Sequence, residues 1–246
     1  MKISSSLNKK DVFVLVICLF FMLAALGSTG RMGRENAKRV ICASNIQKSL
    51  MASTSFAREH EGKYPYNWGI WPWDADCDTV NLLLEYMGVD VSQIEQEQDN
   101  NIPVQDIFYC PSNIPQRKAR DIYWNHHFPS LRILSYVYLF RSVLTIYVEN
   151  QSETELVVDA VLSQRKNRQT GETYNLNEFP NGNFGQITNG AMEAYYGYYD
   201  SSSHLKSLKE PYGGNIGFVD GHVQWRDFKD MANRITTSSV GPMWWW

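Results

Sequence analysis

Residues 12–26 (VFVLVICLFFMLAAL) decide the fold of this chain, because they form fifteen apolar residues in a row. At 1.5 Å per residue this run is about 22 Å long as a helix. With the uncharged residues 27–30 it reaches about 28 Å, close to the ~30 Å hydrocarbon thickness of a bilayer. We therefore expect residues 12–30 to be a transmembrane anchor that follows a short basic leader at residues 1–11.

The alternative is a cleaved secretory signal peptide, with Ala25-Leu26-Gly27 as its cleavage site. The residues that follow favour an anchor instead. Residues 34–60 (RENAKRVICASNIQKSLMASTSFAREH) contain neither Pro nor Gly. Their apolar side chains recur near helical spacing on one face, at Ala43, Ile46, Leu50 and Ala57. We predict that the anchor leads into an amphipathic spine helix over residues 31–62. Basic residues on the two sides of the apolar run are nearly balanced, so charge gives no membrane orientation.

The remaining residues, 63–246, are enough for one domain with a hydrophobic core. The whole chain has a net charge of −3 and a sequence pI of about 6.0, which argues against a nucleic-acid partner. Aromatic residues make up 13 % of the chain, far more than a disordered tail contains. These features predict a folded head outside the cytoplasm.

Local patterns predict the elements of this head. We expect a helix over residues 78–87, with an Asp at its start as the cap and Gly88 at its end. Runs rich in β-branched and aromatic residues predict strands at residues 107–110, 131–139, 143–148 and 156–158.

The C-terminal part contains the clearest hairpin pattern. Residues 217–225 (GFVDGHVQW) place Asp220-Gly221 between two apolar-rich arms, which predicts a two-residue type I′ turn. A short closing helix is expected over residues 226–235. The tail Trp244-Trp245-Trp246 either folds back onto the head or forms an exposed adhesive patch.

Five short stretches of the chain match one family when they are taken together: residues 34–46, 61–65, 110–112 (CPS), 135–138 (SYVY) and 215–225 (NIGFVDGHVQW). They resemble bacterial prepilin-like proteins related to type II secretion pseudopilins, and the last resembles the signature of a subgroup with a His-x9-Asp-Gly pattern. Two features depart from the family. The leader lacks the usual Gly-Phe and Glu, and fifteen residues instead of nine lie between His204 and Asp220.

The resemblance implies an α+β fold in which an N-terminal transmembrane and spine helix packs on an antiparallel β-sheet head. It implies a structural subunit or accessory of a type II secretion or pilus-like envelope assembly, and no enzymatic activity. The location implied is the inner membrane, with a single pass and the head in the periplasm or otherwise outside the cytoplasm. The partners implied are the membrane and other pseudopilins, as homo- or hetero-oligomers.

A second interpretation is a monomeric, envelope-anchored binding module. Aromatic faces beside Asn and Gly can stack on sugars or contact a partner protein. The candidate contact residues lie in one loop: Tyr195, Tyr196, Tyr198 and Tyr199. Polysaccharide is the candidate ligand.

Three of the four cysteines lie outside the apolar run that contains Cys18. Outside the cytoplasm, three thiols favour one disulfide and one free cysteine. Cys42 and Cys110 both lie in the stretches that resemble the family, so the resemblance favours a Cys42–Cys110 disulfide. Cys77–Cys110 is the second choice.

We predict no catalytic residue, no cofactor and no metal. The chain has no CxxC pair and no GxSxG, HExxH or P-loop motif. His204, His222 and Asp220 could form a metal site. We interpret Asp220 and Gly221 instead as turn residues and His222 as a strand residue beside the turn. Asn215 and Trp225 complete this C-terminal signature.

Overall fold

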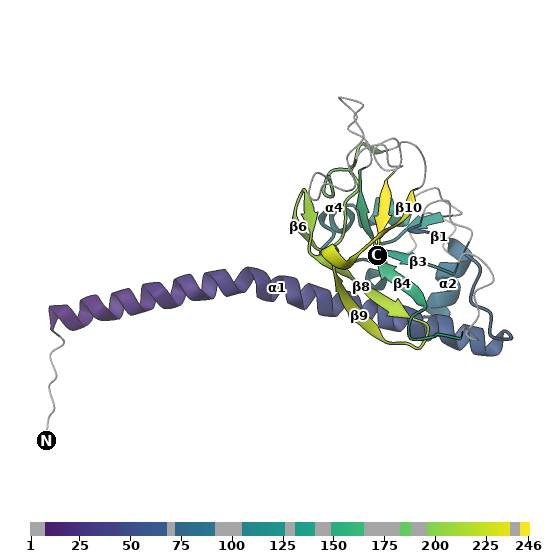
Figure 1. Ribbon diagram of the computed structural model, residues 1–246, viewed down its shortest axis with the longest axis horizontal. Helices are drawn as coiled ribbons and strands as arrows, with labels where there is room; N and C mark the ends of the chain where they lie inside the picture. The colour runs from purple at the N-terminus through teal and green to yellow at the C-terminus, as the bar shows by residue number, and fades with distance from the viewer. Residues whose placement is uncertain are drawn as a thin grey trace, which may run out of the picture. The chain divides into compact units, whose positions relative to one another are not determined.

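The structure is a computed structural model, and it describes residues 8–67, 72–91, 105–125, 131–140, 149–164, 183–187, 196–236 and 242–246. The chain forms two compact units, Met1–Ala37 and Lys38–Trp246. The fold class is α+β with antiparallel sheets, as expected from the sequence (Figure 1).

One helix, α1 (Lys9–Glu59), covers 51 residues and includes most of both the expected anchor and the expected spine. It continues through Gly30 and Gly33 without a break. Its first part exposes large apolar side chains: Val12, Phe13, Val14, Leu15, Val16, Ile17, Leu19, Phe20, Phe21, Met22 and Leu23. Among the described residues, none of the helices combines the length and the apolarity needed to cross a membrane.

The second part of α1 belongs to the unit Lys38–Trp246 and packs with one face. Ile46, Leu50 and Ala57 are buried, as their spacing predicts, whereas Ala43 is only half-buried because Cys42 takes the inward position. The Asn45 side chain donates to the Tyr136 hydroxyl (3.1 Å). Helical spacing thus located this buried face to within one residue.

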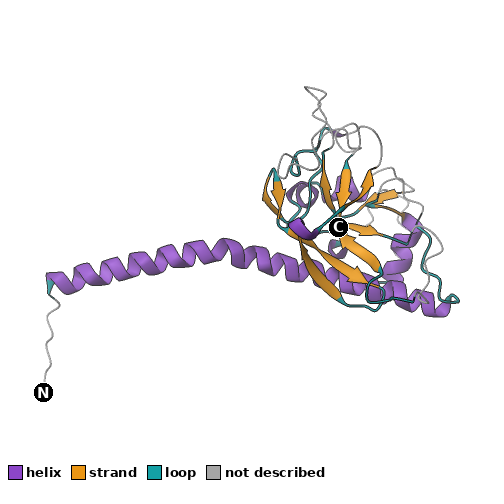
Figure 2. Cartoon of the chain, in the orientation of Figure 1, coloured by secondary structure: helices purple, strands orange, loops and turns teal. Residues whose placement is uncertain are grey.

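The second part of α1 packs against a β-sheet of the head (Figure 2). This sheet has the strand order β3-β4-β8-β9, and all its neighbouring strands are antiparallel. Its strands are β3 (Tyr136–Tyr138), β4 (Glu155–Asp159), β8 (Gly213–Phe218) and β9 (Val223–Asp227). At Gly217 in β8 a Cβ atom would lie 2.6 Å from Ile46 Cγ2 and 2.8 Å from Leu50 Cδ1. Glycine at this position therefore lets strand and helix approach closely.

Three smaller sheets complete the head. The first has the order β10 (Asn233–Thr236), β11 (Met243–Trp245) and β5 (Val161–Ser163). The others pair β1 (Asp74–Asp76) with β2 (Leu131–Ile133), and β6 (Leu205–Ser207) with β7 (Glu210–Pro211). The short helices are α2 (Cys77–Tyr86), η1 (Asp106–Phe108), α4 (Ile114–Lys118), α5 (Arg120–Trp124) and η2 (Phe228–Asp230).

Several sequence predictions are confirmed. Helix α2 lies one residue earlier than expected, because Asp76 is the cap and its carboxylate accepts from the Thr79 backbone N–H (2.8 Å). Gly88 has a φ of +79°, as a residue at the helix end requires. The predicted strand 156–158 lies within β4. The tail folds back, because β11 pairs with both β5 and β10 and Trp244 is fully buried.

Other predictions are wrong. Residues 107–110 are not a strand, because Phe108 and Tyr109 donate backbone hydrogen bonds to carbonyls three residues earlier and form η1. The run 131–139 splits into β2 and β3, because the intervening Leu134 donates its N–H to Trp73 instead. The expected closing helix over 226–235 is reduced to the three-residue 3-10 helix η2, which lies between the end of β9 and the strand β10. β10 pairs with the C-terminal tail. The predicted strand 143–148 lies outside the described residues.

Candidate functional site

Four buried side chains converge inside the head: Cys42, Cys110, Asp159 and His204. Cys42 comes from α1, Cys110 follows η1, Asp159 ends β4 and His204 precedes β6. Their candidate ligand atoms all lie within 4.8 Å of one another. We call this set the Cys–His–Asp cluster. It forms only because α1 packs on the sheet, since 162 positions separate its first and last members.

The distances within the cluster are short. Cys42 Sγ lies 2.7 Å from Cys110 Sγ, and Cys110 Sγ lies 3.5 Å from His204 Nε2. The same His204 nitrogen lies 3.3 Å from Asp159 Oδ2. The Ser112 backbone N–H donates to Cys110 Sγ at 3.4 Å. Each member of the cluster therefore touches at least one other member.

Asp159 is held by Asn215, one of the residues of the C-terminal signature. Both the backbone N–H and the side-chain amide of Asn215 donate to Asp159 Oδ2, at 2.7 and 2.8 Å. The amide also donates to the Arg39 carbonyl of α1 (3.2 Å). The other carboxylate oxygen, Oδ1, is buried and has no hydrogen-bond partner among the described residues. Asn215 thus joins α1, β4 and β8 beside the cluster.

Trp225 closes the cluster on the side of β9. Its ring meets the His204 ring edge to face, with centroids 5.2 Å apart. The Arg39 guanidinium lies over the Trp225 ring, 3.9 Å from its centroid. A cation stacked in this way is attracted by the face of the ring. Asn215 and Trp225 therefore lie around the cluster as a supporting shell.

The members of the cluster shift one another's protonation. Burial raises the pKa of Cys110, but the hydrogen bond from Cys42 and the charge of His204 outweigh it and lower the pKa to about 6. Burial, and then the hydrogen bond to Cys110, raise the pKa of Cys42. Burial lowers the pKa of His204, yet Cys110 and Asp159 raise it well above its usual value. Cys110 and His204 therefore favour each other's charged forms.

The arrangement differs from a cysteine-protease triad. In a triad the nucleophile and the carboxylate contact opposite nitrogens of the imidazole ring. Here Cys110 Sγ and Asp159 Oδ2 both lie nearest to Nε2 of His204. All four side chains are buried, and among them only Cys110 contributes to the lining of a hollow of about 460 Å³ between α1 and the segment around η1. The geometry suits ligation or thiol pairing better than nucleophilic attack.

Cys42 and Cys110 lie side by side, which the predicted disulfide requires, but both are free thiols in the structure. The disulfide therefore stays a prediction. Cys77, at the start of α2, is half-buried and does not belong to the cluster. The sequence singles out Cys42, Cys110 and His204 as candidates but not Asp159, which directly follows the predicted strand 156–158.

The structure does not bring His204, Asp220 and His222 together. His204 is buried against Asp159, whereas His222 is partly exposed and its Nδ1 lies 2.6 Å from Asp220 Oδ1. The predicted type I′ turn is also wrong. Asp220 does not have a positive φ, and Gly221 does, at +91°. Gly221 donates to the Phe218 carbonyl and Phe218 donates to the His222 carbonyl, which gives a three-residue loop with a left-handed last residue.

In this turn Gly221 has a positive φ, which favours glycine over residues with a side chain. Gly221→Val should destabilise the head by at least about 1–2 kcal/mol, because a β-branched residue tolerates a positive φ poorly. A Cβ at Gly221 would meet nothing within 4 Å, so the cost comes from the backbone and not from a clash. The matched control is Gly221→Asn, which tolerates the left-handed region and should cost little. Equal urea midpoints for the two variants would contradict this assignment.

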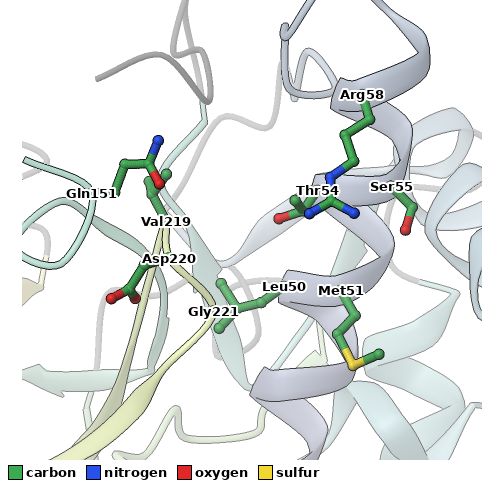
Figure 3. A pocket seen from close by; sticks show the side chains of 9 residues that line it. All are labelled: Leu50, Met51, Thr54, Ser55, Arg58, Gln151, Val219, Asp220 and Gly221. Carbon is green, nitrogen blue, oxygen red and sulfur yellow. The ribbon is translucent and has the colours of Figure 1, made fainter. Parts of the chain in front are cut away.

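A hollow lies between α1 and the turn that follows β8, with a volume of about 450 Å³ (Figure 3). Its lining comes from Leu50, Met51, Thr54, Ser55 and Arg58 on one wall and Gln151, Val219, Asp220 and Gly221 on the other. Arg58 and Asp220 are the charged side chains of this lining. They lie on opposite walls, so the hollow does not gather ligating groups at one point.

The tyrosines predicted as contact residues are exposed where they are described. Tyr196, Tyr198 and Tyr199 have between 41 % and 46 % of their surface exposed. Tyr195 lies outside the described residues. A polysaccharide ligand for this loop stays a prediction.

Comparisons with models of protein families, with curated proteins and with solved structures found no match to this chain.

Proposed function

We propose that this protein is a structural, membrane-anchored subunit of a pseudopilin-like envelope assembly. In this proposal residues 12–30 hold the chain in the inner membrane, and the apolar side chains at the start of α1 pack against equivalent helices of neighbouring subunits. The head lies outside the cytoplasm and gives the subunit its contacts and its stability.

The observation that carries this proposal is the composition of α1. A single helix of 51 residues exposes eleven large apolar side chains between residues 12 and 23, and further along it buries Ile46, Leu50 and Ala57 in the head. Exposed apolar patches of this size on a folded protein mark surfaces that another molecule or a membrane covers. The apolar residues lie all around the helix in that stretch, which is typical of a helix buried on every side.

The roles of the signature residues in the head also support this proposal. Asn215 and Trp225 surround a buried cluster, and Asp220 and Gly221 shape an exposed turn. These are structural roles. The Cys–His–Asp cluster is buried and lacks triad geometry.

Retention of the apolar run tests this function. The full chain, expressed in a Gram-negative host, should remain in the membrane after alkaline carbonate washing, and its mature N-terminus should precede residue 12. N-terminal sequencing and intact-mass measurement of the detergent-extracted protein give both results. A mature chain that starts near Ser28 would contradict the proposal, because the apolar residues would then have been removed.

A further inference from the structure

We propose that Cys42, Cys110, Asp159 and His204 bind one divalent cation that prefers sulfur and nitrogen ligands, with zinc as the best match. The cation would join α1 to the three head segments that supply the other ligands. This inference is independent of the proposed function, because a head that binds zinc does not require assembly and assembly does not require zinc.

The ligand set has the number and the chemistry of a structural zinc site. Such sites are tetrahedral and take all four ligands from cysteine, histidine and carboxylate side chains, with no position left for water. The cluster offers two thiols, one imidazole and one carboxylate, all buried. Binding takes both cysteines as thiolates and His204 as a neutral imidazole, so the protons that these groups lose go to solvent, with no change of oxidation state.

Two of the distances already match a tetrahedral zinc. Sulfur and nitrogen ligands on one such ion lie about 3.5 Å apart, and nitrogen and oxygen ligands about 3.3 Å apart, from the usual bond lengths. The observed distances are 3.5 Å for Cys110 Sγ to His204 Nε2 and 3.3 Å for His204 Nε2 to Asp159 Oδ2. These three side chains therefore need little movement to bind one ion.

The separation of the two sulfur atoms does not choose between the alternatives. They lie 2.7 Å apart. A disulfide bond is about 2.05 Å long, whereas two thiolates on one tetrahedral zinc lie about 3.8 Å apart. The surroundings of the two cysteines therefore have to decide.

Those surroundings favour the cation. A disulfide would engage only the two cysteines, and Asp159 Oδ1 would stay buried without a hydrogen-bond partner among the described residues. Buried polar groups without partners are rare in folded proteins. A divalent cation would bind all four side chains at once, and it would bring a positive charge beside the buried carboxylate of Asp159.

The supporting shell also fits a metal site. Metal ligands are commonly held by further hydrogen bonds that orient them. Here Asn215 donates twice to the Asp159 carboxylate, and the Ser112 N–H donates to Cys110 Sγ. The His204 ring also contacts the Trp225 ring edge to face. Asp159 and Cys110 are therefore oriented by neighbouring donors before any ion binds.

His204 also has an unusual backbone conformation. Its φ is +53°, in the left-handed region that non-glycine residues rarely adopt. Such strain persists where the surroundings hold a residue in place for a function. At His204 this conformation accompanies a fully buried ring that lies beside Cys110 and Asp159.

The test is to measure zinc and free thiols on the same sample. The full chain is purified in detergent without chelator under anaerobic conditions, zinc is measured by mass spectrometry, and thiols are counted after unfolding. We expect about one zinc per chain and all four thiols free. His204→Ala and Asp159→Asn should each lower the zinc content at least several-fold, whereas His222→Ala and Cys77→Ser, both outside the cluster, should keep it at the parent level.

A second measurement uses only the parent chain, so it tests the proposal even if the variants do not fold. Cobalt added to the metal-free, reduced parent chain should produce the intense visible bands of a tetrahedral thiolate site, and zinc should abolish them. Three results would overturn the proposal: a parent chain with two thiols missing and no zinc, a reduced chain that binds neither cobalt nor zinc, or zinc retained at the parent level in His204→Ala.

Discussion

Trp244→Ala should lower the free energy of unfolding of the head by about 3–5 kcal/mol, the usual cost of removing a large buried aromatic side chain. Trp244 is fully buried in β11, and its ring meets Trp73 edge to face with centroids 4.9 Å apart. The substitution leaves a large cavity and removes this aromatic pair. For a domain of this size the melting temperature should fall by roughly 10 °C.

The matched control for this prediction is Tyr66→Ala, because 67 % of Tyr66 is exposed. Its melting temperature should lie within about 1–2 °C of the parent, since exposed substitutions rarely cost more than about 0.5 kcal/mol. Circular dichroism of the full chain in detergent measures both variants. Equal melting temperatures for Trp244→Ala and the parent would mean that the tail does not belong to the core.

The sequence could predict the elements that depend on local patterns. The buried face of α1 follows from the spacing of Ile46, Leu50 and Ala57, and the end of α2 follows from Gly88. The arms of the hairpin follow from two apolar-rich runs around Asp220-Gly221. In these cases a few neighbouring residues contain the physical cause of the structure.

Elements that depend on distant partners could not be predicted in this way. Residues 233–236 form a strand because they pair with β11, and no local pattern indicates that partner. For a similar reason, the sequence predicts a two-residue turn after β8, whereas the structure has a three-residue loop. Asp-Gly suits more than one turn type, and the Phe218–His222 hydrogen bond selects the one observed.

The Cys–His–Asp cluster also depends on residues far apart in the sequence, so local patterns do not predict it. Cys42 and Cys110 were paired through the resemblance, but Asp159 reads as an ordinary polar residue after a strand. His204 was compared with Asp220 along the chain, whereas in the structure its carboxylate partner is Asp159. Sheet pairing of β4 with β8 places Asn215 on Asp159, and this contact depends on the tertiary fold.

The largest functional effect should come from placing charge in the exposed apolar stretch of α1. Phe20 and Phe21 are each 68 % exposed. The double substitution Phe20→Asp and Phe21→Asp should abolish membrane retention and assembly, because each Asp at the centre of an inserted helix costs about 2.5–3.5 kcal/mol. The head does not include these residues, so the near-ultraviolet circular dichroism of the double variant should match that of the parent.

Cysteine cross-linking along one turn of α1 tests the proposed assembly most directly. Single cysteines at positions 15, 16, 17 and 18 sample every side of the helix, and Cys18 is native and exposed. The other accessible thiols are removed by Cys77→Ser and, where needed, Cys18→Ser. In intact membranes we expect dimers and larger species at one or more of these positions, and their loss when Phe20 and Phe21 are replaced by Asp. Only monomers at all four positions would contradict a function based on packing of α1 against neighbouring subunits.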